Sequence, residues 1–183
     1  MREPVIPELD AETYLLWESR QRDRHELHHG FVVAFAGGTL DHDRIALNLR
    51  NLFDAAFPAP CRSFGSDVRV RADTATFFYA DAGVVCEGTP GAATEISAPR
   101  IIAEVLSPST RAYDLIDKRA AYRKIGSLEG YVVVHTAYRR IELDVRTPGG
   151  WSTWVSDAEP IPLGAGGLAF ADVYARTSVD ASV

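Results

Sequence analysis

Two apolar runs in the middle of the chain constrain its fold more than any other feature. The segments FFYADAGVVC (77–86) and RIIAEVL (100–106) are almost wholly apolar. Runs this short and this apolar are typical of β-strands that are covered on both faces. The chain is therefore expected to form a sheet with other elements packed on both of its sides.

Three segments with helical spacing are available to cover such a sheet. The first begins after Asp10, a favoured N-cap residue, and directs Tyr14, Leu15 and Trp17 toward the core. The second begins near Asp41 or Asp43 and ends at Pro58, with apolar positions at helical spacing, namely Ile45, Leu49, Leu52, Phe53 and Ala56. The third is DLIDKRAAYRKIG (114–126), with Asp114 as the expected cap and Gly126 as the expected terminator.

The remaining patterned segments predict further strands. HELHHGFVVAFAGG (25–38) suggests a hairpin or a bent strand pair, and FGSDVRVRAD (64–73) alternates apolar and charged residues. Three more strands are expected in GYVVVHT, RRIELDVR and WSTWVS, and the clean alternation of IELDV places that strand nearer a sheet edge. The order of elements predicts an α+β or α/β domain with one central mixed sheet flanked by helices.

Length and composition favour one globular domain spanning 1–183, with loose termini at about 1–8 and 175–183. No apolar run is long enough to span a bilayer, and the first residues lack a secretory pattern, so a cytoplasmic location without a membrane is expected. Cys61 and Cys86 are expected to be buried free thiols of a reducing compartment. The net charge of −6 argues against a general nucleic-acid coat protein.

Two carboxylates break the apolar pattern of the central strands. Asp81 lies within FFYADAGVV, and Glu104 lies within RIIAEVL between Ala103 and Val105. Burying an unpaired carboxylate costs several kcal/mol, so an ordinary core would exclude both. Each acid could lie at a strand end and pair with a nearby arginine. A shared divalent cation would instead compensate both acids at once.

A lysine on the third helix strengthens the case for a site. Lys118 shares a helix face with Leu115, Tyr122 and Ile125, and that face is expected to pack on the sheet. The alternative is a lysine whose stem packs while its ammonium reaches water. Beside two metal-binding acids, the ammonium could position or help to deprotonate an attacking water, or neutralise charge on a phosphoryl transition state.

The segment RIIAEVLSPSTRAYDLIDKRAAYRKIGSLEGYVVV (100–134) closely resembles the signature of the bacterial Uma-type proteins. These proteins are classed as endonucleases of the restriction-endonuclease-like PD-(D/E)xK superfamily and were long catalogued as a domain of unknown function. The similarity continues in HELHHGFVVAFAGG, DHDRIALNL, RSFGSDVRV and YADAGVV and covers the chain roughly from Tyr14 to Tyr174. The resemblance implies a restriction-endonuclease-like core and a metal-dependent phosphodiester hydrolase site.

The resemblance also implies metal ligands. Asp81 matches the Asp of the PD element, although Ala80 stands where the family usually has proline. Glu104 matches the acid of the (D/E)xK element, and Glu26 matches an upstream acid that could complete the oxygen shell. Oxygen ligands suit Mg²⁺ or Mn²⁺, which is the expected cofactor.

The lysine of that element departs from the superfamily pattern. Leu106 occupies the position two residues after Glu104, and Lys118 matches the helix-borne lysine of the Uma-type proteins instead. Tyr122, one turn later, matches a tyrosine that could order Lys118 or touch a phosphate. His42 and Asp67 match recurrent positions and are candidate accessory residues.

The implied partner is a nucleic acid, with DNA as the expected substrate, and a homodimer would suit cleavage of two strands. Candidate phosphate contacts are the arginines Arg69, Arg71, Arg111, Arg119 and Arg123, each of which could equally be a solvated surface charge. A non-catalytic nucleic-acid- or protein-binding module on the same fold is the alternative.

A literal HExxH pattern points to a different chemistry. His25, Glu26 and His29 satisfy the zinc-protease motif, which works only on a helix. Gly30 and the β-prone FVVAF follow directly, and no HxxGxxH continuation exists. An exposed polar bend is therefore the favoured interpretation.

Overall fold

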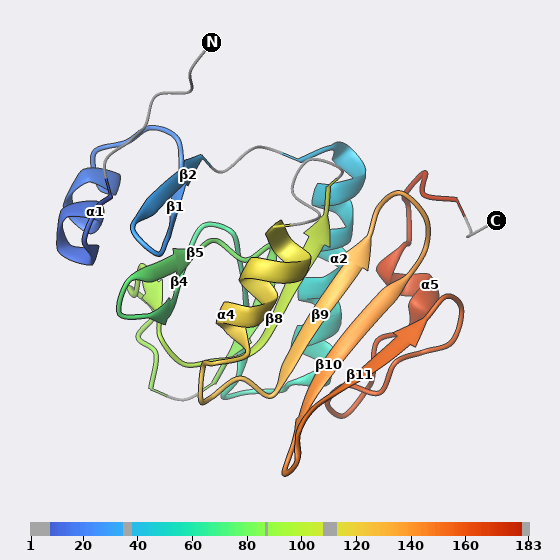
Figure 1. Cartoon of the computed structure of the whole chain (residues 1–183). Helices are drawn as coiled ribbons and strands as arrows, with labels where there is room; N and C mark the ends of the chain where they lie inside the picture. The colour runs from blue at the N-terminus through green and yellow to red at the C-terminus, as the bar shows by residue number, and fades with distance from the viewer. Residues whose placement is uncertain (1–7, 35–37, 87, 108–112, 181–183) are drawn as a thin grey trace.

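The strands of the protein form two sheets that share a junction (Figure 1). The computed structural model describes residues 8–34, 38–86, 88–107 and 113–180. A six-stranded sheet has the order β11-β10-β9-β8-β6-β3, and a five-stranded sheet has the order β2-β1-β5-β4-β7. The six-stranded sheet consists of β3 (Arg62–Gly65), β6 (Ala82–Val85), β8 (Pro99–Leu106), β9 (Gly130–His135), β10 (Ile141–Thr147) and β11 (Gly150–Ser156).

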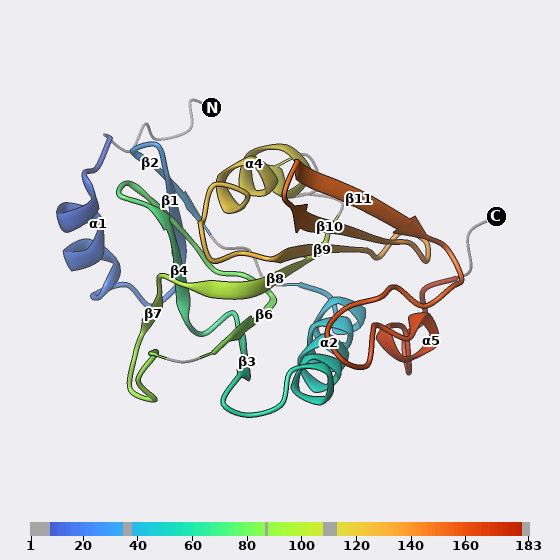
Figure 2. The same cartoon turned by 90° about the horizontal axis from the view of Figure 1, so that it is seen from below.

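The six-stranded sheet is mixed, because β8 and β9 run parallel and its other neighbours run antiparallel. The long helix α2 (Leu40–Ala56) and the short α5 (Phe170–Val173) lie on one side, and α4 (Arg119–Tyr122) lies on the other (Figure 2). Alternate residues of β8 follow this division. Ala103 and Val105 join the apolar core under α2, whereas Ile102 and Leu106 join the core under α4.

The five-stranded sheet carries the N-terminal helix α1 (Ala11–Glu18). Its strands are β1 (His25–His28), β2 (Phe31–Ala34), β4 (Arg69–Asp73), β5 (Thr76–Phe78) and β7 (Glu95–Ile96). Asp10 caps α1 as predicted, with its carboxylate accepting from the Thr13 N–H at 2.9 Å. Tyr14 is fully buried against Leu27 and Phe77, which together form the small core of this sheet.

The α+β class and the mixed sheet flanked by helices are confirmed, but the strands divide between two sheets where one was expected. The run FFYADAGVVC is the reason. Its first residues belong to β5 of the five-stranded sheet, and Ala82–Val85 form β6 of the six-stranded sheet. Residues 79–81 cross between them, so Asp81 lies at the junction of the two sheets rather than inside a strand.

The predicted cap of the third helix is wrong. Asp114–Lys118 form a π-helical segment, η1, which continues into α4, and Tyr113 before it already has helical dihedral angles. Asp114 is 4% exposed and lies inside the helical segment rather than before it. The second helix begins slightly earlier than predicted, because Thr39 caps it by accepting from the His42 N–H at 3.2 Å.

The prediction of two buried free thiols is also wrong. Cys61 and Cys86 form a disulfide, and both are only partly buried. Each lies directly outside a pair of antiparallel strands in which Arg62 faces Val85, so the two cysteines face one another. The pairing of β3 with β6 therefore brings together two cysteines that are 25 residues apart in the sequence.

Part of the expected loose C-terminus is held in place. Ser178 N–H donates to the Asp41 carboxylate at 3.1 Å, and Val179 is buried against the main core. Within the described ranges, no helix has the length and apolar character needed to cross a membrane.

Candidate active site

Asp81 and Glu104 face one another at the junction of the two sheets. Strands β6 and β8 pair antiparallel with Ala82 opposite Ala103, which sets the preceding Asp81 opposite Glu104. Asp81 Oδ2 accepts from the Val105 N–H at 2.7 Å and lies 3.3 Å from His42 Nε2. The side chains are buried, with residue exposures of 8% for Asp81 and 2% for Glu104. Strand pairing thus places the two predicted acids side by side.

Lys118 reaches Glu104 from the helical layer above the sheet. Its Nζ lies 2.8 Å from Glu26 Oε1, 3.3 Å from Glu104 Oε1 and 3.5 Å from Asp114 Oδ1. We call Lys118, Glu26, Glu104 and Asp114 the Lys118 cluster. Its members come from η1, β1 and β8, and all four are nearly inaccessible to water. The snorkelling alternative for Lys118 is excluded, because its ammonium is buried among carboxylates.

The Lys118 cluster contains one cation and three carboxylates. Burial raises the pKa of Glu104 well above its ordinary value, and the neighbouring charges of Asp81 and Asp114 add to this against the attraction of Lys118. Burial likewise raises the pKa of Glu26. Burial alone would lower the pKa of Lys118, but the three carboxylates outweigh it and raise this pKa well above its ordinary value. The lysine therefore stays protonated at neutral pH.

Hydrogen bonds fix the carboxylates of this cluster. Tyr122 Oη donates to Glu104 Oε1 at 3.1 Å, and the Tyr79 N–H donates to Glu26 Oε1 at 2.9 Å. Tyr122 is fully buried, and burial raises its pKa well above the ordinary value, so the phenol remains a donor. Tyr122 therefore orients Glu104, whereas the sequence suggested a contact with Lys118 or with a phosphate.

Asp114 is the member of the cluster that sequence reasoning missed as a site residue. It was assigned a capping role, because Asp at the start of an apolar helical pattern is a common N-cap. The available signal was its i, i+4 spacing to Lys118, which places both side chains near one another on a helical turn. In the structure the two residues bound η1, and both are buried.

His42 and Asp67, the two predicted accessory residues, both lie near Asp81. Burial of His42 disfavours its protonation, but the hydrogen bond and charge of Asp81 outweigh this and raise the pKa of His42. Asp67 forms an ion pair with Arg24 and has an exposed side chain. Asp67 and Asp81 line a pocket of about 400 Å³ together with Asp43, Arg50 and Ser66. Asp81 therefore connects the buried cluster with a polar opening.

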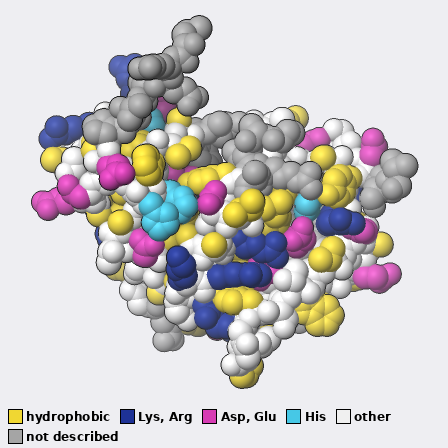
Figure 3. All heavy atoms as spheres, viewed as in Figure 1, with side chains coloured by type: hydrophobic (Ala, Val, Ile, Leu, Met, Phe, Trp, Pro, Cys, Tyr) yellow, Lys and Arg dark blue, Asp and Glu magenta, His cyan; other side chains and the backbone are white. Residues whose placement is uncertain are grey.

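The predicted arginine contacts lie elsewhere and are mostly paired. Arg69 and Arg71 both form ion pairs with Glu95, and Arg119 and Arg123 both form ion pairs with Asp144. Arg111 lies outside the described residues. Lys and Arg side chains gather in the middle of the face that carries α4 (Figure 3). On α4 itself, Arg119 and Arg123 are balanced by the acids Glu142 and Asp144.

The zinc-protease interpretation does not fit the structure. His25 and Glu26 lie on strand β1, and His29 has a positive φ of 51° in the turn after it, so the two histidines do not share a helix face. Among the residues that the structure describes, no three His, Cys, Asp or Glu side chains form a metal-binding group.

The donor set at Asp81 and Glu104 nevertheless fits a hard cation. Asp81 uses Oδ2 and Glu104 uses Oε1 in their contacts within the described part of the chain, which leaves one carboxylate oxygen of each for a ligand. Mg²⁺ commonly takes one or two protein carboxylates and keeps several waters. Glu26, the predicted third ligand, likewise directs Oε1 to Lys118 and to the Tyr79 N–H, so among the described contacts its other oxygen is left as well.

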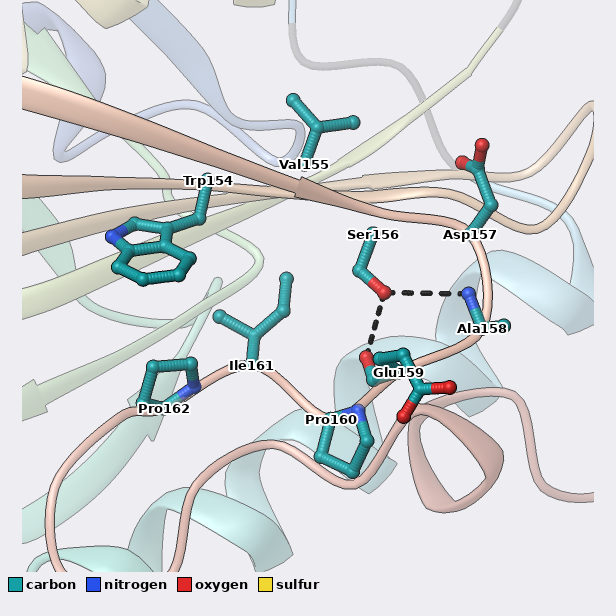
Figure 4. A pocket seen from close by; sticks show the side chains of 9 residues that line it. All are labelled: Trp154, Val155, Ser156, Asp157, Ala158, Glu159, Pro160, Ile161 and Pro162. Atoms are coloured by element: carbon teal, nitrogen blue, oxygen red, sulfur yellow. Dashed lines mark hydrogen bonds between the residues drawn. The ribbon is translucent and has the colours of Figure 1, made fainter.

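A second opening lies at the outer edge of the six-stranded sheet. This pocket of about 390 Å³ is formed by the end of β11 and the segment that follows it, residues 154–162 (Figure 4). Its acids are Asp157 and Glu159, and Asp157 is paired with Arg140 at 2.7 Å. None of the predicted catalytic residues lines it, so the opening at Asp81 is the better candidate.

The protein has a restriction-endonuclease-like fold. The structure aligns, with a TM-score of 0.74 and 14% identity, with the "crystal structure of a putative nuclease belonging to DUF820" from Anabaena variabilis ATCC 29413, covering 91% of this chain and 97% of that one. The model of the Uma2 family, described as "Putative restriction endonuclease", matches residues 11–162. The chain belongs to the Uma2 family.

Two curated relatives are similar over most of their length. The uncharacterized protein slr1290 of Synechocystis sp. (strain ATCC 27184 / PCC 6803 / Kazusa) is 32% identical over 179 residues, which cover 93% of each chain. The uncharacterized protein sll1609 of the same organism is 30% identical over 139 residues, covering 73% of this chain and 78% of that one.

Proposed function

We propose that this protein is a divalent-metal-dependent endonuclease that hydrolyses phosphodiester bonds in nucleic acid, with DNA as the expected substrate. One observation carries the proposal: Asp81, directly before β6, and Glu104 of β8 face one another beside the buried Lys118. Family membership supports the same class of reaction.

Asp81 and Glu104 would hold Mg²⁺ or Mn²⁺ through their remaining oxygens. When bound, such a cation supplies a water of lowered pKa and stabilises negative charge on the reacting phosphate. Val105 N–H and His42 keep Asp81 oriented, and Tyr122 keeps Glu104 oriented. The protein thus presents two fixed carboxylates and needs little rearrangement to bind a metal.

Lys118 would act as a fixed positive charge rather than as a general base. Its three carboxylate neighbours keep the ammonium protonated, so it can donate a hydrogen bond but cannot accept a proton at neutral pH. Glu26 and Asp114 hold Nζ in place next to Glu104. The ammonium would orient the attacking water and offset charge that develops on the phosphate.

The test combines metal binding with cleavage. Titration calorimetry with Mg²⁺ and Mn²⁺ should show binding by the wild type and by Lys118→Ala, but not by Asp81→Ala or Glu104→Ala. Cleavage is then tested on single- and double-stranded DNA and RNA. Only the wild type with metal should cleave, and DNA is the expected substrate. Metal-independent nucleic-acid binding without cleavage under any condition would favour the non-catalytic module instead.

A further inference from the structure

The pocket beside Asp81 contains an arginine to which no role has been assigned. Arg50 lines this opening from helix α2, together with Ser66, Asp67 and Asp81. Neither an ion pair nor a hydrogen bond engages Arg50 within the described residues, although three carboxylates line the same pocket. Asp67 is paired with Arg24, and Asp81 is held by His42 and Val105. Arg50 is therefore available for a ligand.

A glycine makes room for the arginine. A Cβ atom on Gly65 would lie 2.7 Å from Arg50 Nη1 and 3.3 Å from its Cδ, so the guanidinium would have to shift from its present position. Gly65 lies in β3 and pairs with Ala82, the residue that follows Asp81. The guanidinium therefore lies against the backbone of β3, close to the candidate metal ligand, because Gly65 has no side chain.

The charges around this guanidinium indicate what it would bind. An arginine presents a planar set of donors that matches phosphate oxygens, and the Ser66 hydroxyl adds a donor in the same pocket. The carboxylates would repel a free anion, so the ligand is one that a cation at Asp81 would also attract. A phosphate of a nucleic-acid backbone meets both conditions.

We propose that Arg50 binds a backbone phosphate of the nucleic-acid substrate and positions the strand next to Asp81. This inference rests on the proposed function, since it assigns the substrate contact of the same site. It differs from the surface arginines considered above, because Arg50 has no ion pair among the described residues and adjoins the acids. Gly65 contributes because, without a side chain, it leaves space for the guanidinium.

The experiment measures binding of a short fluorescein-labelled DNA, single-stranded and duplex, by anisotropy over a series of salt concentrations. Ca²⁺ replaces Mg²⁺ so that the probe is not consumed. Arg50→Ala should weaken binding roughly tenfold, the effect of losing one charge-assisted contact. The slope of log K against log salt should fall in magnitude by about 0.9 for the duplex or about 0.7 for the single strand.

Gly65→Ala provides a variant that keeps the charge but displaces it. Its effect on DNA binding should match that of Arg50→Ala, and the double variant should be no worse than either single one, since both changes remove the same contact. Arg44→Ala is the matched control. Arg44 lies on the same helix and also lacks a partner within the described residues, but it does not line the pocket. It should change binding by less than about twofold.

The outcomes separate this inference from the proposed function. If Arg50→Ala and Gly65→Ala bind DNA with the wild-type affinity and salt slope, or if Arg44→Ala is equally impaired, the assignment of Arg50 is overturned while metal-dependent cleavage can still stand. If both pocket variants lose binding but no metal supports cleavage, Arg50 is confirmed and the enzyme is not. If the wild type binds neither form of DNA, both fail.

Discussion

Two consecutive residues at the junction of η1 and α4 belong to two ionic clusters of opposite character. Lys118 is one cation among three carboxylates in the Lys118 cluster. Arg119 belongs to a second group, the Asp144 cluster, made by Asp144 and Glu142 of β10 with Arg119 and Arg123. There, the Asp144 carboxylate forms ion pairs with Arg119 Nη2 at 2.5 Å and with Arg123 Nη2 at 2.6 Å. The first cluster has an excess of acid, and the second is balanced.

The difference appears in the pKa values of the acids. Burial disfavours the charged form of Asp144, but hydrogen bonds from Arg119, Thr153 and Arg123 outweigh this and lower its pKa. In the Lys118 cluster the pKa of Glu104 moves the opposite way, because burial disfavours its charge and neighbouring acids add to this, against the attraction of a single ammonium. A balanced cluster stabilises the fold, whereas an excess of buried acid costs stability and is typical of sites that bind a cation or do chemistry.

The largest expected contrast is in catalysis. Glu104→Gln should reduce metal-dependent cleavage on the order of a thousandfold, since an amide oxygen is a poor substitute for a carboxylate at a hard cation. Glu142→Gln, which removes an acid of the Asp144 cluster, should leave the rate nearly unchanged. Single-turnover cleavage at saturating metal measures both. Equal losses in the two variants would show that Glu104 has no special part in the reaction.

Removing a cation should destabilise the protein more in the Lys118 cluster than in the Asp144 cluster. Lys118→Met leaves three buried carboxylates without a counter-ion and should lower the free energy of unfolding by about 3–5 kcal/mol. Arg119→Met should cost only about 1–2 kcal/mol, because Arg123 and Thr153 still serve Asp144. Urea denaturation with a check for unchanged m-values measures both. Adding Glu26→Gln to Lys118→Met should recover part of the loss, and no recovery would contradict the excess-acid interpretation.

Lowering the pH should remove the stability that the acids of the Asp144 cluster contribute. The pKa values of Asp144 and Glu142 are lowered from 3.8 and 4.5, so their contribution is present above those values and is lost as pH falls through the lower folded-state values. Asp144→Asn should therefore cost about 1.5–3 kcal/mol at pH 7 and progressively less in acid. Unfolding measured from pH 7 to pH 2 tests this. A cost independent of pH would mean that packing, not charge, supports the cluster.

Much of the framework could be predicted because local patterns determine it. The apolar run RIIAEVL identified β8 as a central strand, and the alternation in IELDV predicted a strand nearer the sheet edge, where β10 indeed lies beside the edge strand β11. The division into two sheets escaped prediction, because the crossing at residues 79–81 has the same apolar composition as the strands on either side. The disulfide escaped for a related reason: it depends on the pairing of β3 with β6, which no local pattern specifies.

The candidate site was predictable where charge stood out against an apolar background. Asp81, Glu104 and Lys118 attracted notice because each is charged where its neighbours indicate burial. Asp114 did not, because an acid at a helix start has an ordinary explanation. Arg50 was missed since an arginine on a solvated helix carries no signal, and its importance depends on a glycine in another element. Such contacts are visible only once the chain is folded.

The smallest predicted effect is on stability: neutralising Glu104 should stabilise the metal-free protein, whereas neutralising Asp144 should destabilise it. Glu104 has a raised pKa, so its stabilising contribution is complete below its ordinary value of 4.5 and is lost as pH rises through the folded-state value. Glu104→Gln mimics the protonated acid, keeps an acceptor for Tyr122, and leaves Lys118 two other carboxylates. It should therefore stabilise the metal-free protein by about 1 kcal/mol at pH 7.

Thermal and urea unfolding in EDTA would measure this gain in stability. Asp144→Asn serves for comparison, because it should lower the stability at the same pH. The gain should vanish below the ordinary pKa of Glu104, where the wild type is itself protonated. It should also shrink when Mg²⁺ is added, since the cation stabilises only the wild type. A loss of stability in Glu104→Gln at pH 7 would contradict the proposed imbalance, because it would show that Lys118 needs all three acids.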